Sequence, residues 1–448
     1  METTFAAALQ TRRQAEGLSL RELSALVRYS AGWLSRVARG QGTPTLALAR
    51  ACDEALGAGG VLVALARAEL TGGARPEQLP VPVSAFVGRA GTLADLDAEL
   101  ARARAEGAAL TVAVDGPPGV GKSAVALHWA HRVAAQFPEG VLYADLRGHS
   151  PRGPAADPNA VLDAFLRALG QETAPDSVEA RAALFRTAVA QRSGPVLVVL
   201  DNAVDTAQIR HLLPGAAGCA VVVTGRRRLT GLSMTTGARR ISLAPLSCRE
   251  SLDLLRAVLG HARVEAERPA ARAVVRHCGR LPLALRVTAE RLASHPHRPL
   301  SHAVEEWEDG GLDVLADHDD AGLSVRGSFD RSYDELDPEV ARTFRLLGLM
   351  PAAPVGTAAV AALTGTPLAR TRRHLDDLVA RHLLEETGVH RYEIHDLLRA
   401  YARERAGAEE TAGERHACAA RLASWYPHGA DPAGAPAGCP GADGGGAG

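Results

Sequence analysis

The chain of 448 residues almost completely lacks lysine. Lysine and arginine together number 50, and because Lys122 is the only lysine, the other 49 basic residues are arginines. An ammonium group is a compact point charge with three donors, whereas a guanidinium is planar and broad. The single lysine therefore marks a position where a compact cation is needed.

Other features are absent as well. The six cysteines are scattered, with no C-x-x-C pair and no metal-ligand spacing. The N-terminus lacks the apolar stretch of a secretory signal, and no run of about 18 apolar residues could span a bilayer. The net charge of −1 does not indicate that the chain as a whole binds a polyanion. We expect a soluble, cytoplasmic protein with reduced thiols and about three domains.

Lys122 lies in the pattern G-x-x-x-x-G-K-S, which runs from Gly116 to Ser123. An apolar run at 110–114 precedes it and a helical pattern at 124–133 follows, which is the strand–loop–helix context of a phosphate-binding loop. Backbone N–H groups would bind the phosphates, Lys122 would reach the β- and γ-phosphates, and Ser123 would hold Mg²⁺. The flanking context argues against a chance match in a glycine-rich chain. The loop residues expected to bind nucleotide are Gly116, Gly119, Val120, Gly121, Lys122, Ser123 and Ala124.

Strand and helix patterns alternate after a linker predicted at 71–85, which indicates a parallel α/β sheet over 86–245. The expected strands are 110–114, 140–144, 196–200, 220–224 and 240–243. The third expected strand ends at Asp201, whose carboxylate is predicted to hold Mg²⁺ together with Ser123; an ordinary turn cap is the alternative. Arg226 follows the fourth strand at the same edge and is expected to face the γ-phosphate. Asp201 and Arg226 are thus the candidate catalytic residues.

The first 70 residues are predicted to form a helix-turn-helix domain. Residues 1–50 contain seven arginines and three glutamates, a local net charge of +4. Ser19 and Glu22 have the spacing of a capping box, and Ser30 is expected to cap a second helix after a tight turn. The second helix of such a motif enters the major groove. The candidate DNA-binding residues are Ser30, Ala31, Trp33, Ser35 and Arg36, with Arg21 at a phosphate; the alternative is a helical bundle that binds protein.

The remaining sequence is predicted to be mainly helical. A helical domain is expected over 246–312, and three helices with a hairpin around Gly388 indicate a winged helix over 320–405. Residues 406–448 are predicted to hold a short helical remnant and a disordered tail rich in Gly, Ala and Pro. The predicted fold is therefore multidomain: an all-α helix-turn-helix, an α/β P-loop domain, a helical domain and a winged helix.

Taken together, these motifs resemble the NB-ARC branch of the STAND signalling ATPases, in particular bacterial regulators with an N-terminal Xre/Cro-like helix-turn-helix. The resemblance rests on the phosphate loop and on residues 86–89, 200–203, 224–226, 278–285 and 392–396. It implies that Val87 and Arg89 border the adenine and that Pro282 packs on the base. It also implies that His395 reaches the β-phosphate of ADP and holds a closed state. Such proteins usually continue into a helical-repeat sensor, and this chain ends where one would begin.

Asn202 departs from the pattern, since relatives often have a second acid there. An amide cannot accept a proton from the attacking water, so we expect a slow ATPase at most. The predicted function is an ATP/ADP-switched, DNA-binding transcriptional regulator that uses Mg²⁺, self-associates in the ATP state and does not bind a membrane. The alternatives are a turnover P-loop ATPase or kinase, and a signalling scaffold whose N-terminal helices bind protein.

Overall fold

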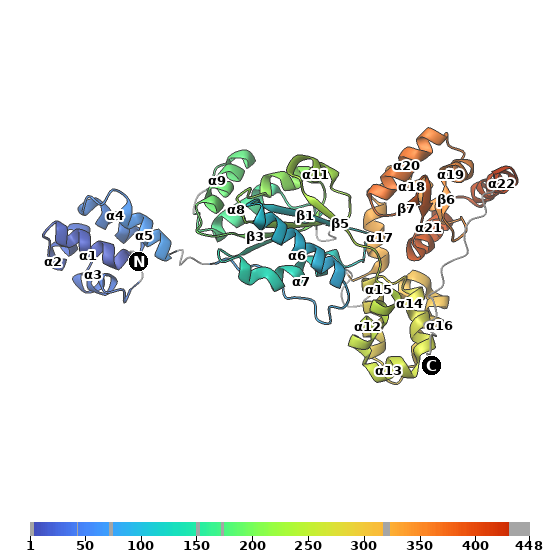
Figure 1. Cartoon of the computed structure of the whole chain (residues 1–448), viewed down its shortest axis with the longest axis horizontal. Coiled ribbons are helices and arrows are strands. Elements are labelled where there is room, and N and C mark those ends of the chain that lie inside the picture. The colour runs from blue at the N-terminus through green and yellow to red at the C-terminus, as the bar shows by residue number, and fades with distance from the viewer. Residues whose placement is uncertain are drawn as a thin grey trace.

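The computed structural model describes residues 4–42, 44–70, 75–148, 153–171, 174–316 and 323–429, and only the backbone of 67–70 and 426–429. Figure 1 shows three parts in succession: N-terminal helices, a central domain built on a sheet, and a C-terminal half made mainly of helices. This is the multidomain fold that the sequence predicts. Within the described residues, no helix is long and apolar enough to cross a membrane.

The N-terminal part is a bundle of helices. They are α1 (Phe5–Ala15), α2 (Leu20–Val27), α3 (Ala31–Ala38), α4 (Leu46–Ala55) and α5 (Val61–Leu70). Both predicted N-caps are present: Ser19 and Glu22 form a reciprocal capping box, and the Ser30 hydroxyl accepts from the Trp33 N–H. Arg28, with a φ of 57°, makes the tight turn between α2 and α3. The apolar faces of the helices share one core.

The central domain contains a parallel five-stranded sheet with the order β2-β3-β4-β1-β5. Its strands are β1 (Leu110–Asp115), β2 (Val141–Asp145), β3 (Leu197–Ala203), β4 (Ala220–Gly225) and β5 (Arg239–Ser242). All five expected strands are therefore present, with ends shifted by one to three residues. Because the carboxyl ends of parallel strands share one edge, the phosphate loop, Asp201 and Arg226 meet there.

Helices cover both faces of this sheet. One face packs against α6 (Ala90–Ala105) and α7 (Lys122–Val133). The other packs against α8 (Pro158–Ala168), α9 (Val178–Ala190), α10 (Thr206–Ile209) and α11 (Thr230–Thr236), with 3₁₀ turns η1 (Ala134–Gln136) and η2 (Arg210–Leu212) in the connections. Successive strand side chains alternate between the two cores, so Val112 and Val114 lie in one and Ala113 in the other.

Residues 75–80 of the predicted linker lie along the edge strand β2. Glu77 forms a parallel bridge with Val141, and Gln78 Oε1 accepts from the Tyr143 N–H at 3.2 Å. The prolines and glycines of this segment indicated a loop, and periodicity gave no sign of the pairing. This part of the predicted linker is therefore packed against the sheet.

The C-terminal half begins with a group of helices. They are α12 (Cys248–Leu259), α13 (His261–Ala266), α14 (Arg268–His277), α15 (Pro282–Ala293), α16 (Leu300–Gly310) and the 3₁₀ turn η3 (Gly311–Val314). α15 packs against α12, and α16 packs against α14.

A second group of helices accompanies a small antiparallel sheet of order β6-β8-β7. The elements are α17 (Val325–Tyr333), α18 (Pro338–Leu347), β6 (Val355–Gly356), α19 (Thr357–Thr364), α20 (Leu368–Ala380), β7 (Glu385–Gly388), β8 (Arg391–Glu393), α21 (Asp396–Glu409) and α22 (Ala412–Gly429). The three expected helices and the hairpin around Gly388 are present. The predicted disordered tail falls on residues 430–448, outside the described part of the chain.

Candidate nucleotide site at the carboxyl edge of the sheet

The phosphate loop joins β1 to α7 through three glycines with positive φ: Gly116 at 148°, Gly119 at 78° and Gly121 at 92°. A Cβ on Gly116 would lie 2.7 Å from the Leu243 carbonyl oxygen, so only glycine fits between this loop and the end of β5. The loop leads directly into the first turn of α7, whose free N–H groups form a site for anions.

Lys122 is 8% exposed, and its Nζ donates to the carbonyl oxygens of Gly116 and Pro117, each at 2.9 Å. Burial, with the nearby charge of Arg226, lowers the pKa of the Lys122 ammonium to about 7. The only lysine of the chain therefore lies inside a loop that fits a compact cation and holds it against carbonyls.

Asp201 and Ser123, the predicted Mg²⁺ ligands, lie together. Asp201 is 5% exposed, and burial raises its pKa, although hydrogen bonds from the Thr224 and Ser123 hydroxyls favour its ionised form. A hydroxyl and a carboxylate beside a phosphate loop are the oxygen ligands that Mg²⁺ prefers. Thr224, which donates to Asp201, belongs to the motif at 224–226 but was not among the predicted site residues.

Asn202 has a φ of 55° and joins the same network. Its N–H donates to Thr224 Oγ1 at 3.0 Å, and its Nδ2 donates to Asp145 Oδ1 at 3.1 Å. The side-chain amide thus links β3 to Asp145 of β2, and an acid at this position could not donate that hydrogen bond.

Arg89 braces the phosphate loop from outside. Its guanidinium donates to the Val120 carbonyl at 2.9 Å and to the Ala244 carbonyl at 2.7 Å, and burial lowers its pKa. Its N–H donates to Glu250 Oε1 at 2.9 Å. Glu250 was not predicted, although the S-x-x-E spacing from Ser247 identifies it as a capping-box residue of α12.

The segment that contains Val87 is fixed on α7 by its neighbour. The Phe86 ring stacks on the His128 ring with centroids 4.0 Å apart and an interplanar angle of 8°. Val87 is half-buried beside this pair and packs against the core of the sheet. The stacked pair was not predicted, because neither residue belongs to a sequence motif with the other.

Pro282 and its neighbour close over the phosphate loop from the other side. The Leu283 N–H donates to the Gly119 carbonyl at 3.2 Å. A Cβ on Gly121 would lie 3.7 Å from Pro282 Cγ. The start of α15 therefore contacts the phosphate loop at two of its glycines.

His395 lies against the segment that precedes Pro282. Its Nε2 donates to the Gly279 carbonyl at 2.7 Å, while its Nδ1 accepts from the Leu397 N–H at 3.3 Å. This pattern assigns the neutral tautomer with the proton on Nε2, and burial lowers the pKa of the ring. The N-cap of α21 is thus His395, whose ring nitrogen accepts the hydrogen bond from the Leu397 N–H.

Arg226 contacts the C-terminal half. Its Nη1 donates to the Ser328 carbonyl at 2.6 Å and to Ser332 Oγ at 2.9 Å, both in α17. Burial, with the charge of Arg331, lowers its pKa to about 9. From the sequence, we expected this guanidinium to face a γ-phosphate. In the structure it is bonded to α17, and its charge still lowers the pKa of Lys122.

Asp115, directly before the phosphate loop, is a second junction with the C-terminal half. Its carboxylate is 1% exposed and binds Ser242 and Arg240 of β5, the latter at 3.2 Å. His382 Nε2 lies 3.1 Å from Oδ1, within ion-pair distance but with poor hydrogen-bond alignment. Burial opposes the ionisation of Asp115, but the three partners outweigh it and lower its pKa. Neither member of this junction was predicted, since the pairing depends on how distant segments dock.

Comparison with known proteins gives a domain match at the N-terminus and two relatives that align with most of the chain. A helix-turn-helix domain model matches residues 4–66. The regulatory protein AfsR of Streptomyces coelicolor is 43% identical over 364 residues, and that of Streptomyces griseus is 42% identical over 358. The chain is therefore similar in sequence to the AfsR regulatory proteins over most of its own length. The alignments cover 79% of this chain, which spans about a third, 36%, of either relative.

Solved structures give weaker likenesses. A signal transduction ATPase with numerous domains and a tetratricopeptide repeat sensor, from Pyrococcus horikoshii, has 17% identity and a TM-score of 0.33 over 79% of this chain and 47% of its own. A Walker-type ATPase of Pyrococcus abyssi has 13% identity and a TM-score of 0.49 over 73% and 98%. The recognition made from the motifs is confirmed in these terms: an N-terminal helix-turn-helix domain, a parallel sheet with a phosphate loop, and similarity to proteins described as regulatory.

The candidate DNA-binding residues lie on and beside α3. Ser30 and Arg36 are exposed, as is Arg21 at the start of α2. Ala31, Trp33 and Ser35, expected to be exposed, are half-buried. The Arg36 guanidinium lies 4.9 Å from the Trp33 ring centroid, and a Cβ on Gly42 would lie 3.6 Å from the same ring. Trp33 is therefore partly a packing residue.

Proposed function

We propose that the chain is an ATP/ADP-switched transcriptional regulator of the NB-ARC type, in which the nucleotide controls how the C-terminal half docks on the phosphate-loop edge. The observation that supports this proposal is that three charged residues lie together at the phosphate-loop edge of the sheet: Lys122, Arg226 and Asp115. Two of these three charged residues are bonded to C-terminal elements through Ser328, Ser332 and His382. A phosphate at Lys122 would compete for Arg226, because guanidinium binds phosphate more strongly than a carbonyl.

Nucleotide binding is supported by the fit of the residues present. The loop N–H groups and Lys122 suit a di- or triphosphate, and Ser123 with Asp201 suits Mg²⁺, which supplies charge neutralisation between the phosphate oxygens when bound. Pro282 and Arg89 contact the loop, and the resemblance implies that they border the base together with Val87. His395, neutral and bonded to Gly279, would stabilise the closed arrangement that we assign to the ADP state.

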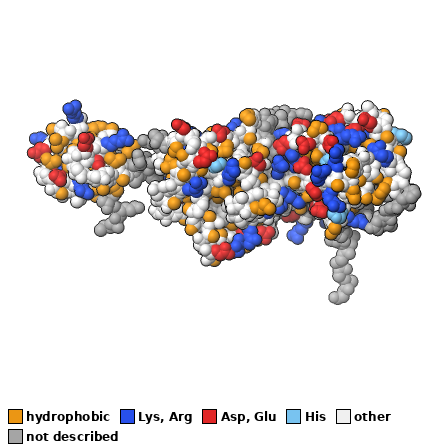
Figure 2. Space-filling model, turned by 90° about the horizontal axis from the view of Figure 1, so that it is seen from above, with side chains coloured by type: hydrophobic (Ala, Val, Ile, Leu, Met, Phe, Trp, Pro, Cys, Tyr) orange, Lys and Arg blue, Asp and Glu red, His pale blue; other side chains and the backbone are white. Residues whose placement is uncertain are grey.

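DNA binding is supported by the helix-turn-helix match and by the relatives' description as regulatory proteins. Figure 2 shows scattered basic side chains on the visible face of the N-terminal domain, with no continuous basic patch. One copy should therefore bind weakly and with a strong salt dependence. Two copies brought together by ATP-dependent self-association would bind half-sites about one helical turn apart and gain apparent affinity, about 10²–10⁴-fold. A protein-binding scaffold is the alternative.

The test uses DNA from around the coding region of the protein, with either ADP or a non-hydrolysable ATP analogue. We expect tighter binding and a larger oligomer with the analogue, measured by fluorescence anisotropy and light scattering. Arg36→Ala, a change at an exposed residue, should weaken DNA binding in both states without altering nucleotide affinity. Equal DNA affinity and a monomer in both states would contradict the switch, and unchanged binding by Arg36→Ala would favour the scaffold.

A further inference from the structure

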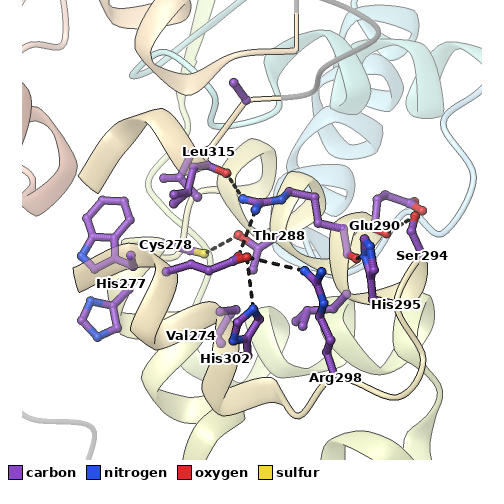
Figure 3. Close-up of a pocket in the computed structure, with 17 residues that line it drawn as sticks. Val274, His277, Cys278, Thr288, Glu290, Ser294, His295, Arg298, His302 and Leu315 are labelled. Carbon is purple, nitrogen blue, oxygen red and sulfur yellow. Dashed lines mark hydrogen bonds and ion pairs between the residues drawn. The ribbon is translucent and has the colours of Figure 1, made fainter. Parts of the chain in front are cut away.

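A cavity of about 370 Å³ lies in the helical part of the C-terminal half, away from the phosphate loop. It is lined by α14, α15, α16 and the segment from η3 to Ala316 (Figure 3). Its volume falls at the lower end of the range for small-molecule sites. One wall is apolar and aromatic, with Val274, Leu292 and Trp307, and the His277 ring lies 5.9 Å from the Trp307 ring.

The opposite wall bears an excess of positive charge. Arg291 Nη2 binds Glu306 Oε2 at 2.9 Å, while Arg298 Nη1 and His302 Nε2 lie 3.7 Å and 3.3 Å from Glu306 Oε1. Two guanidiniums and an imidazole thus face the Glu306 carboxylate, while the other imidazole nitrogen lies 3.6 Å from Glu305 Oε2, outside the lining. Glu290, the other acid of the lining, lies 3.9 Å from Arg286, which is not part of the lining.

Arg298 is the arginine of this wall that is best placed to bind a ligand. Its distance to Glu306 exceeds that of a hydrogen bond, and its side chain is 47% exposed at the mouth of the cavity, next to His302 at 38%. Figure 3 shows Arg298 and His302 pointing toward the same carboxylate, with Thr288 and Cys278 deeper in the cavity. We propose that this cavity binds a small organic monoanion, with its carboxylate at Arg298 and His302 and its apolar body against Trp307 and Leu292.

The position of the cavity would let such a ligand influence the nucleotide site through the helix that joins them. α15 begins at Pro282, on the phosphate loop, and its later turns place Thr288, Arg291 and Leu292 in the cavity. Arg291 Nη1 also donates to the Val314 carbonyl, and the next residue, Leu315, accepts from the Val325 N–H at the start of α17. Because α17 holds Arg226, the ligand would act on both ends of the junction. This second statement rests on the proposed function.

The test uses phenylacetate and its neutral isostere phenylacetamide as probes of the full chain, in ligand-observed NMR titrations. We expect saturable phenylacetate binding in the millimolar range or tighter, and amide binding at least about tenfold weaker because a charge-assisted hydrogen bond is lost. Arg298→Gln should weaken phenylacetate binding to the same extent, while Arg272→Gln, at an exposed arginine of α14 outside the lining, should not. Glu306→Gln removes the competing carboxylate and should strengthen binding severalfold.

Equal binding of acid and amide by the unmodified protein would overturn the site without any need for a variant. So would the absence of saturation, or equal effects of Arg298→Gln and Arg272→Gln. The link to the switch is tested by the rate of ADP release, which phenylacetate should change severalfold. If phenylacetate binds and the rate is unchanged, the link fails and the site stands; if the chain binds no ADP, the proposed function fails and the NMR result is unaffected.

Discussion

At the scale of single residues, Lys122 is the group that composition and structure mark together. Its Nζ fits between two carbonyl oxygens at 2.9 Å, inside a loop whose glycines already contact β5 and α15. A guanidinium is wider and has a fixed planar fork. The other 49 basic positions are all arginine, so the steric limit that we infer for Lys122 is specific to this loop.

We therefore predict that Lys122→Arg loses ATP binding nearly as completely as Lys122→Ala, although the charge is kept. The expected loss is at least about 100-fold, since two charge-assisted hydrogen bonds to phosphate are worth about 3 kcal/mol together. Calorimetry on folded variants measures it. Equal ATP affinity of the unmodified protein and Lys122→Arg would contradict the steric argument.

The lowered pKa of Lys122 predicts proton uptake on nucleotide binding. With a pKa of about 7, the amine is largely neutral at about pH 8 in the free loop, and a phosphate would stabilise its charged form. We expect a net uptake approaching one proton per nucleotide at that pH and less on the acid side of 7. Calorimetry in two buffers of different ionisation enthalpy counts the protons, and identical heats in both would refute the shift.

At the scale of elements, the contact between residues 86–89 and the start of α12 fixes one side of the site. Gly88 has a φ of 75°, and a Cβ there would lie 2.6 Å from Glu250 Oε1, the acceptor for the Arg89 N–H. A side chain at this position would be strained by the backbone conformation and would displace the Glu250 carboxylate. Glycine therefore preserves the bond between this segment and α12.

Gly88→Ala should lower the free energy of unfolding by about 1–3 kcal/mol and weaken nucleotide binding, because strain at Gly88 displaces Arg89 from the phosphate loop. The matched control is Gly91→Ala, three residues on in α6, where a Cβ meets nothing within 4 Å and the helix gains about 0.5–1 kcal/mol. Chemical denaturation and ADP titration of both variants compare them. Equal behaviour of the two alanines would show that the contact has no such role.

The sequence predicts the elements of the site better than their partners. The phosphate loop, the strand ending at Asp201 and the helix caps follow from local patterns, and all are present. Glu250, His128 and His382 could not be predicted, because each acts through a segment distant in sequence. The same holds for Arg226. Its position at a strand end follows from the local sequence, but its bond to Ser328 depends on how the C-terminal half docks on the sheet.

At the scale of the whole molecule, the C-terminal half is held on the sheet edge at separate points. Arg226 is bonded to α17, the Arg228 N–H donates to the Ala380 carbonyl at 2.9 Å, and His382 lies at Asp115. Burial lowers the pKa of His382 against the opposing effect of Asp115, so the docked arrangement favours the neutral ring. The neighbouring charges of Lys122 and Arg228 act in the same direction as burial.

The sign of the pH dependence follows from these shifts. A histidine whose pKa is lowered by docking favours the docked state above its ordinary value of 6.5 and destabilises that state as the pH falls below it. Asp115 keeps its charge as the pH falls through this value, because its partners lower its pKa below the ordinary 3.8. We therefore expect the radius of gyration from small-angle scattering to increase between about pH 7.5 and pH 5.5. His382→Asn should reduce that increase.

Arg226→Ala tests the same docking without a change of pH. It removes the bonds to Ser328 and Ser332, so the C-terminal half should be released more readily at neutral pH and the radius of gyration should increase. Arg227→Ala, at the adjacent arginine, removes the same charge and should leave the scattering unchanged. The two variants separate a specific junction from a general effect of charge. Scattering that is the same for both variants, and constant over the pH range, would mean that these contacts do not hold the two halves together.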